Sequence, residues 1–158
     1  MPVKSKSNRS TAARLFDDMV RCETRLYNAL SVRLRESHGI VATQFEGLRY
    51  IRDHPESRVA DLAANFAIGI GATSKVIDRL ENEGWVRRIP NPADRRSSLI
   101  ALTARGSQLV NEAERTFTDC VTDLIVTALT QAQLDTVVDA LAILRTTLEL
   151  DQIGTPVG

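Results

Sequence analysis

The sequence predicts a mainly α-helical fold with a small β-hairpin wing: a winged helix-turn-helix with N- and C-terminal dimerisation helices. Three observations predict it. Apolar residues recur at helical spacing along both ends of the chain. Two short helical segments flank the Gly-containing turn AIGIG. Two short apolar runs follow them, joined by the turn-forming stretch PNPADRR.

The composition is that of one globular domain. The chain has 158 residues, of which 25% are charged and 43% are hydrophobic. A net charge of zero hides an asymmetry, because residues 1–105 hold 18 basic and 12 acidic residues, whereas residues 106–158 hold 2 and 8. The basic part can therefore face a polyanion while the acidic part stays away from it.

Several classes of protein are disfavoured by what the sequence contains. No apolar stretch approaches the roughly 20 residues that span a bilayer. The basic N-terminus MPVKSKSNRS lacks the apolar segment of a signal peptide, so we expect a cytoplasmic protein without a membrane partner. Cys22 and Cys120 form no C-x-x-C pair, and we expect no disulfide, metal or cofactor.

The two ends of the chain are expected to form helices that pair with a second copy. From about residue 12 to 36, the stripe comprises Leu15, Met19, Cys22, Leu26, Leu30 and Leu34. Near the C-terminus it comprises Leu134, Val137, Leu141, Leu144 and Leu148. These faces exceed what a small winged helix can cover, which predicts a homodimer. We expect a flexible basic tail at 1–11, a dimerisation region at 12–37 and 104–150, and a frayed end at 151–158.

The segment 43–103 is predicted to be the winged helix-turn-helix. The motif TQFE at residues 43–46 resembles a capping box that starts the second helix, which ends near Pro55. Short helices are expected from Val59 to Phe66 and from about Ile70 to Glu83. WVRRI and SSLIALT read as strands, Thr103 can cap a fifth helix, and TQAQ at residues 130–133 is a further capping box.

This order of elements resembles the MarR family of bacterial transcriptional regulators. The segments that carry the resemblance are VADLAANFAI, GATSKVIDRLENEGWVRR and NPADRRSSLIALTARG, and the likeness extends over about residues 15–148. In that family an Asp-x-Arg wing tip precedes the Leu-Thr-x-x-Gly that enters the fifth helix. The resemblance implies a homodimeric regulator, usually a repressor, that binds a pseudo-palindromic operator in double-stranded DNA.

The resemblance assigns roles at the wing tip. It implies that Arg96 enters the minor groove, with Asp94 as the salt-bridge partner that orients its guanidinium, and that Arg95 contacts phosphate. A planar, permanently charged guanidinium suits a narrow minor groove with its concentrated negative potential. The alternative is that Asp94 and Arg96 only make the turn rigid.

The family position also assigns the fourth helix to the major groove. The resemblance favours Ser74 and Lys75 for base or phosphate contact and Arg79 for phosphate contact. Small residues, Gly71 and Ala72 with Thr73 beside them, allow close approach and contact with thymine methyl groups. Because few long hydrogen-bond donors are present, we expect the wing to contribute much of the specificity through DNA shape.

Other chemistry is weakly supported by the residues. GIGATSK lacks the Gly-Lys-Ser/Thr of a phosphate loop, and His38 and His54 have no partner at catalytic or ligand spacing, so we expect no enzyme. Cys22 and Cys120 are expected to be buried core residues. Redox sensing through Cys22 remains an alternative, as does a winged helix that binds only proteins.

The resemblance further implies an effector pocket between the dimerisation helices and the winged helix. In this family such a pocket often accepts a small aromatic or phenolic anion, and displacement of the helices by the ligand releases DNA. The candidate pocket residues are Tyr27, Phe45, Leu48 and Arg88.

Overall fold

The computed structural model describes residues 6–156, and its elements follow the predicted order. The helices are α1 (Lys6–His38), α2 (Ala42–Asp53), α3 (Val59–Phe66), α4 (Ile70–Asn82), α5 (Ala104–Val126) and α6 (Gln131–Leu150). The strands are β1 (Ser57–Arg58), β2 (Val86–Pro90) and β3 (Ser98–Leu102). The predicted mainly α-helical fold with a small β-hairpin is therefore confirmed.

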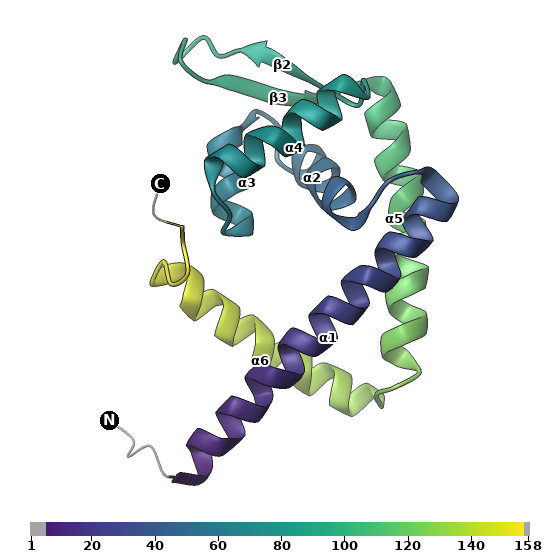
Figure 1. Cartoon of the computed structure of the whole chain (residues 1–158), viewed down its shortest axis with the longest axis vertical. Coiled ribbons are helices and arrows are strands. Elements are labelled where there is room, and N and C mark those ends of the chain that lie inside the picture. The colour runs from purple at the N-terminus through teal and green to yellow at the C-terminus, as the bar shows by residue number, and fades with distance from the viewer. Residues whose placement is uncertain (1–5, 157–158) are drawn as a thin grey trace.

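The winged helix is built from α2, α3, α4 and a three-stranded sheet in the order β1-β3-β2 (Figure 1). Strand β2 pairs antiparallel with β3, with Arg88 opposite Ile100, and forms the wing hairpin. Strand β1 pairs Ser57 with Ile100 on the other side of β3. Strand β1 was not predicted, because two residues are too few to show an alternating pattern.

The start of α2 differs from the prediction. The helix begins at Ala42, and the side-chain Oε1 of Gln44 accepts a hydrogen bond of 3.0 Å from the backbone N–H of Val41. The Ser31 hydroxyl of α1 accepts a further bond from Ala42 N–H. Thr43 is therefore inside the helix, and the predicted capping box at residues 43–46 is wrong by two positions.

The helix caps predicted around the sheet and α6 are confirmed. Thr103 Oγ1 accepts the Gly106 N–H at 3.1 Å and donates to the Gly84 carbonyl oxygen at 2.7 Å, so it caps α5 and holds it to the start of the wing. At the start of α6, Thr130 and Gln133 form the predicted reciprocal capping box.

An aliphatic core lies between α1, α2, α4, α5 and the sheet. Its largest fully buried side chains are Phe45, Leu34, Ile40, Leu48, Leu62, Ile77, Leu80, Ile100, Val86, Val110 and Cys120. The Phe45 ring packs against Phe117 of α5 at a centroid distance of 5.2 Å. The core thus fixes α2 and α4 against the long helices.

Helix α1 begins at Lys6, six residues before the prediction, so residues 6–11 of the expected tail are helical. Residues 1–5 of that expected tail lie outside the described residues. At the other end, residues 151–154 form a turn, and the last two residues of the expected frayed end also lie outside the description.

The expected apolar stripes of α1 and α6 are not covered within one chain. Helix α6 begins at the end of α5 furthest from the wing, as Figure 1 shows, and it contains no buried residue. Leu15 of α1 is 51% exposed and Leu141 of α6 is 40% exposed. The stripe residues therefore face inward only from about Leu30 onward in α1.

A charged cluster joins α2 to α5. The Arg52 guanidinium donates to both carboxylate oxygens of Glu114, at 2.6 and 3.0 Å, and to the Asn111 side chain. It also pairs with Asp53 at 2.8 Å. These hydrogen bonds hold the pKa values of Glu114 and Asp53 below their ordinary values.

Within residues 6–156, no single helix has both the length and the apolar character needed to cross a bilayer. Helices α5 and α6 have the required length and apolar character only as a pair, and a bend of 114° separates them in the described chain.

Candidate nucleic-acid interface

The N-terminal half of α4 presents the first part of a candidate interface. Gly69 is the N-cap residue of α4, and Gly71, Ala72, Lys75 and Arg79 are exposed. Lys75 and Arg79 are one turn apart, so their positive charges lie on one face of the helix. This face combines a close-approach surface of small residues with two cations.

Two residues predicted for this face are less accessible. Ser74 is half-buried in the groove between α4 and the wing. Thr73 is only 2% exposed, and its hydroxyl donates to the Gly69 carbonyl oxygen at 3.0 Å. Thr73 therefore supports the start of α4 from inside, and its contribution to DNA binding stays a prediction.

The wing tip is a structured turn with two exposed arginines, Arg95 and Arg96. Asp94 Oδ1 accepts a hydrogen bond of 2.9 Å from the backbone N–H of Arg96, and its Oδ2 accepts one from the Ser97 hydroxyl. Asn91 adds a bond to the Ala93 N–H. Aspartate and asparagine stabilise turns in this way.

The turn geometry corrects the predicted role of Asp94. Its carboxylate binds the Arg96 backbone, and no ion pair with the Arg96 guanidinium is present among the described residues. Asp94 therefore shapes the tip, and the charged end of Arg96 is left to other partners.

Arg88 joins the wing to α4. Its guanidinium contacts Asp78 at 2.6 Å and Glu81 at 2.8 Å, and its backbone N–H donates to the other Glu81 oxygen at 3.0 Å. Arg88 was predicted to line an effector pocket, but it is placed as a brace between β2 and the helix that carries Lys75. The wing and α4 are consequently held as one unit.

A groove of about 350 Å³ separates α4 from the wing, and Arg58, Ser74 and Arg96 all line it. The sequence analysis missed Arg58, which precedes α3 and lies beside residues predicted to bind DNA. Asp61 accepts hydrogen bonds from both the Arg58 side chain and its backbone N–H, which hold the pKa of Asp61 below its ordinary value. The Arg-x-x-Asp spacing in RVAD is the sequence pattern from which this pair could have been predicted.

A cavity of about 340 Å³ lies behind the helix-turn-helix, between α1, α2, α3 and α4. Tyr27, one of the predicted pocket residues, lines it together with Thr43 and Glu46. Burial and the Glu46 carboxylate raise the pKa of Tyr27 above its ordinary value. The other three predicted residues are not brought here, since Phe45 and Leu48 are fully buried in the core and Arg88 lies on the wing.

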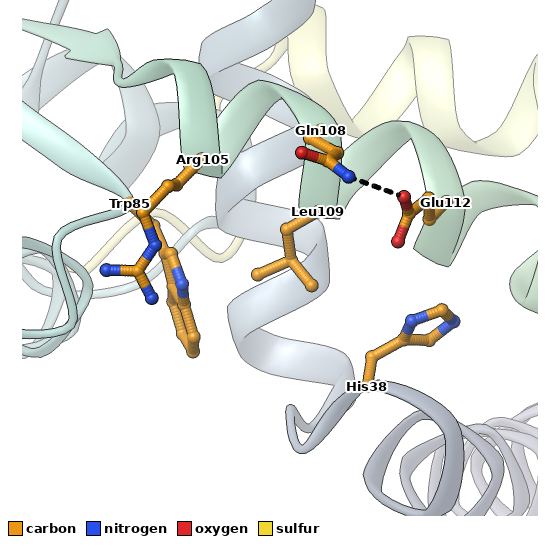
Figure 2. A pocket seen from close by; sticks show the side chains of 6 residues that line it. All are labelled: His38, Trp85, Arg105, Gln108, Leu109 and Glu112. Atoms are coloured by element: carbon orange, nitrogen blue, oxygen red, sulfur yellow. Dashed lines mark hydrogen bonds between the residues drawn. The ribbon is translucent and has the colours of Figure 1, made fainter.

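A shallower depression of about 290 Å³ lies along the first turns of α5, and Figure 2 shows the six side chains that line it, among them Arg105, Trp85 and His38. The Gln108 amide donates to Glu112 at 3.0 Å. His38 Nε2 lies 2.7 Å from Thr116 Oγ1. Of the six lining residues, Gln108 and Glu112 bond to each other, and His38 contacts Thr116 on α5.

The two cysteines differ in environment. Cys120 is buried in the core, as predicted, whereas Cys22 is exposed on α1, and its predicted burial is wrong within a single chain. Cys22 lies on the uncovered half of α1, which explains the difference. Among the residues that the structure describes, no group of three His, Cys, Asp or Glu side chains is placed to hold a metal ion.

Comparison with known proteins places the helix-turn-helix and wing in one family. A profile of the MarR family matches residues 40–98. The multiple antibiotic resistance protein MarR of Salmonella typhimurium is 34% identical over 76 residues, which is 48% of this chain and 53% of that protein. The transcriptional repressor NicR of Pseudomonas putida is 31% identical over 72 residues, or 46% of each chain. The chain thus spans about half the length of these relatives.

Solved structures extend the likeness over the fold. A mutant of Escherichia coli MarR complexed with operator DNA has a TM-score of 0.74 and 26% identity, covering 89% of this chain and 98% of that one. A MarR family regulator from Streptomyces coelicolor in complex with DNA has a TM-score of 0.78 and 23% identity over 88% of each chain, a likeness of fold. Residues 40–98 are therefore a MarR family domain, carried on a chain whose fold along most of its length is that of MarR family regulators.

Proposed function

We propose that this protein is a DNA-binding transcriptional regulator that acts as a homodimer on a pseudo-palindromic operator. The observation that carries the proposal is the exposed face of α4, with Lys75 and Arg79, held beside a wing that exposes Arg95 and Arg96. The MarR family domain and the DNA complexes of similar structures support it.

In this proposal α4 enters the major groove and the wing follows the adjacent minor groove. Lys75 and Arg79 neutralise phosphates, while Gly71 and Ala72 let the helix backbone approach the base edges. Arg96 enters the minor groove, where its guanidinium is free of an intramolecular carboxylate partner among the described residues. Arg58 and Ser74 line the groove between these two contacts and add phosphate partners.

The second copy covers the apolar faces of α1 and α6. Exposed apolar side chains run along both helices: Leu15, Phe16, Val20, Val137, Val138, Leu141, Ile143, Leu144 and Leu148. An exposed surface of this extent marks an interaction site, and closed pairs are the commonest solution. A dimer would present two α4 helices to half-sites about 10 bp apart.

We further propose that the regulator represses and that a small molecule releases it from DNA. The cavity lined by Tyr27 supports this, because its walls come both from α1 and from the helix-turn-helix. A molecule that fills it changes the position of α4 relative to α1, and binding then favours a spacing of the two α4 helices that differs from the spacing on DNA.

The direct test is fluorescence anisotropy with the DNA immediately upstream of this protein's own gene, beside a scrambled duplex of equal length. We expect selective binding that weakens steeply with added salt. Arg96→Ala should reduce affinity for the operator at least about tenfold, because one guanidinium is lost from each minor groove. Arg115→Ala, which removes the same charge from exposed α5, is the matched control and should bind like the wild type.

The outcomes separate the alternatives. Equal weakening by Arg96→Ala and Arg115→Ala contradicts the role of the wing. Failure to bind either duplex at low salt contradicts the regulator and leaves a winged helix that binds proteins. Release of DNA by peroxide that Cys22→Ser abolishes, with no release by small molecules, favours the thiol-based regulator over the ligand-responsive one.

A further inference from the structure

The cavity behind the helix-turn-helix has an apolar body. Leu62, Phe66, Ile68 and Val76 line it, and they come from α3, the turn after it and α4. Its volume of about 340 Å³ lies within the range of small-molecule sites. An apolar or aromatic group of one or two rings suits these walls.

The polar side of the cavity is acidic. Glu23 of α1 and Glu46 of α2 line it together with the hydroxyl groups of Tyr27 and Thr43, and none of its lining residues is basic. Carboxylates and hydroxyls can all accept hydrogen bonds. A bound molecule therefore meets an array of acceptors at this side.

The basic residue associated with Glu46 does not reverse this polarity. Arg49 contacts Glu46 at 2.7 Å, but its guanidinium lies over the rings of Phe45 and Phe117, at 5.1 and 4.6 Å from their centroids, and it is not among the lining residues. Glu23 accepts only the Thr24 hydroxyl, at 3.3 Å, among the described side chains. One carboxylate at the cavity is thus neutralised and the other has no basic partner in the described part of the chain.

From this arrangement we infer that the cavity selects a small aromatic or aliphatic amine in its protonated form and excludes carboxylates of the same shape. This inference rests on the proposed function for its regulatory meaning and names the chemical class of the effector. It differs from the aromatic or phenolic anion that the resemblance to the MarR family implies for this region.

The physical reason is that a bound ammonium group finds acceptors in this cavity, whereas a bound carboxylate loses its water and gains no basic partner. An ammonium group that donates to Glu23 and to the two hydroxyls gains charge-assisted hydrogen bonds, and the faces of Tyr27 and Phe66 add cation–π attraction. A carboxylate in the same place faces Glu23 without a basic partner. Glu23 is exposed, so this repulsion is partly screened by solvent, and the larger cost is the loss of the anion's water with no basic partner to replace it.

Three probes of matched shape test the inference at pH 7: 2-naphthylmethylamine, which is cationic, 2-naphthylmethanol, which is neutral, and 2-naphthoate, which is anionic. Isothermal titration calorimetry with the full chain measures the affinity of each. We expect the amine to bind at least about tenfold more tightly than naphthoate, with the alcohol between them. The preference for the amine should fall as salt is added.

Variants locate the binding. Glu23→Gln should reduce the preference for the amine over naphthoate several-fold, because it removes the unpaired carboxylate and keeps the side-chain size. Glu36→Gln makes the same change on α1 away from the cavity and should leave the preference unchanged. Ile68→Trp fills the cavity from an exposed turn position and should prevent binding of all three probes, with circular dichroism verifying the fold.

The inference is overturned if naphthoate binds as tightly as the amine, or if no probe binds folded wild-type protein at millimolar concentration. It is also overturned if Glu23→Gln and Glu36→Gln behave alike. Operator binding is measured in parallel by anisotropy. Selective DNA binding with a preference for naphthoate sinks only this inference, whereas amine selectivity without DNA binding sinks only the proposed function.

Discussion

Gly106, in the first turn of α5, shows how a single atom constrains the junction between the helix-turn-helix and the long helices. The residue is buried, and a Cβ atom at this position would overlap the Trp85 carbonyl group, coming within 2.8 Å of its carbon. Trp85 O also accepts the Thr103 N–H at 3.0 Å, so the two backbones are held at this approach. The glycine is needed here for space.

We expect Gly106→Ala to lower the free energy of unfolding by about 3 kcal/mol or more, because the backbone of Trp85 or α5 must move. Gly71→Ala is the control, since a Cβ there meets no atom within 4 Å. It should raise the stability by about 0.5–1 kcal/mol through helix propensity. Urea denaturation followed by circular dichroism measures both, and equal effects would refute the steric argument.

Residue-scale predictions from sequence succeeded where the interaction is local. The caps at Thr103 and Thr130 depend on residues three positions away, and both are confirmed. The contacts of Asp94 and Thr73 were not foreseen, because they depend on rotamer and burial, which a single turn of sequence does not specify. Arg88 was misplaced for the same reason, since its partners lie 7 and 10 residues away on another element.

At the scale of elements, the contact between α2 and α5 depends on charge as well as on the core. Arg52 contacts Glu114 through two hydrogen bonds and also holds Asp53. Both carboxylates have pKa values below their ordinary values in the folded chain because Arg52 donates to them. Their contribution to stability is therefore present above the pKa values of the unfolded chain and is lost as the pH falls through the folded values.

We expect Arg52→Gln to lower the free energy of unfolding at pH 7 by about 1 kcal/mol, a modest value because both carboxylates are partly exposed. The difference from the wild type should begin to shrink as the pH falls below about 4–4.5, where carboxylates of the unfolded chain protonate, and should continue to shrink as the pH falls through the lowered folded-state values. Arg145→Gln, at an exposed pair of 3.6 Å, should show little effect at either pH. A difference that stays constant between pH 7 and pH 3 would contradict this account.

Elements were predictable where the apolar period is long, and their ends were not. Helices α3 and α4 were placed to within a residue, because Gly69 directly precedes α4 and Gly84 lies just after its end. Helix α1 starts earlier than expected because Lys, Ser and Arg residues carry no apolar period, although nothing in them prevents a helix. The two-residue strand β1 has no sequence pattern from which it could be predicted.

At the scale of the whole molecule, the apolar faces of α1 and α6 are left exposed within one chain. No residue of α6 is buried, yet its apolar residues keep a helical period. The stripe was predictable from sequence. A second copy of the chain was predicted to cover it, although the apolar pattern alone does not identify the partner.

We expect the wild type to sediment at twice the 17.4 kDa mass of one chain. Leu141→Glu places a charge within the apolar face and should yield monomers that bind the operator at least about 100-fold more weakly, because two half-sites are no longer engaged together. Thr146→Glu adds the same charge beside Asp139, on the other side of α6, and should remain a dimer. Sedimentation equilibrium decides, and a dimeric Leu141→Glu would place the interface elsewhere.

The brace formed by Arg88 has a consequence for the proposed contact with an operator. Because Arg88 holds β2 to Asp78 and Glu81, the distance from α4 to the wing tip is set by the protein and not by the DNA. One inserted base pair lengthens the DNA by about 3.4 Å and rotates the minor groove away from Arg96. With the DNA contacts proposed above, base changes between the two contacts should therefore be tolerated, whereas insertions there should weaken binding.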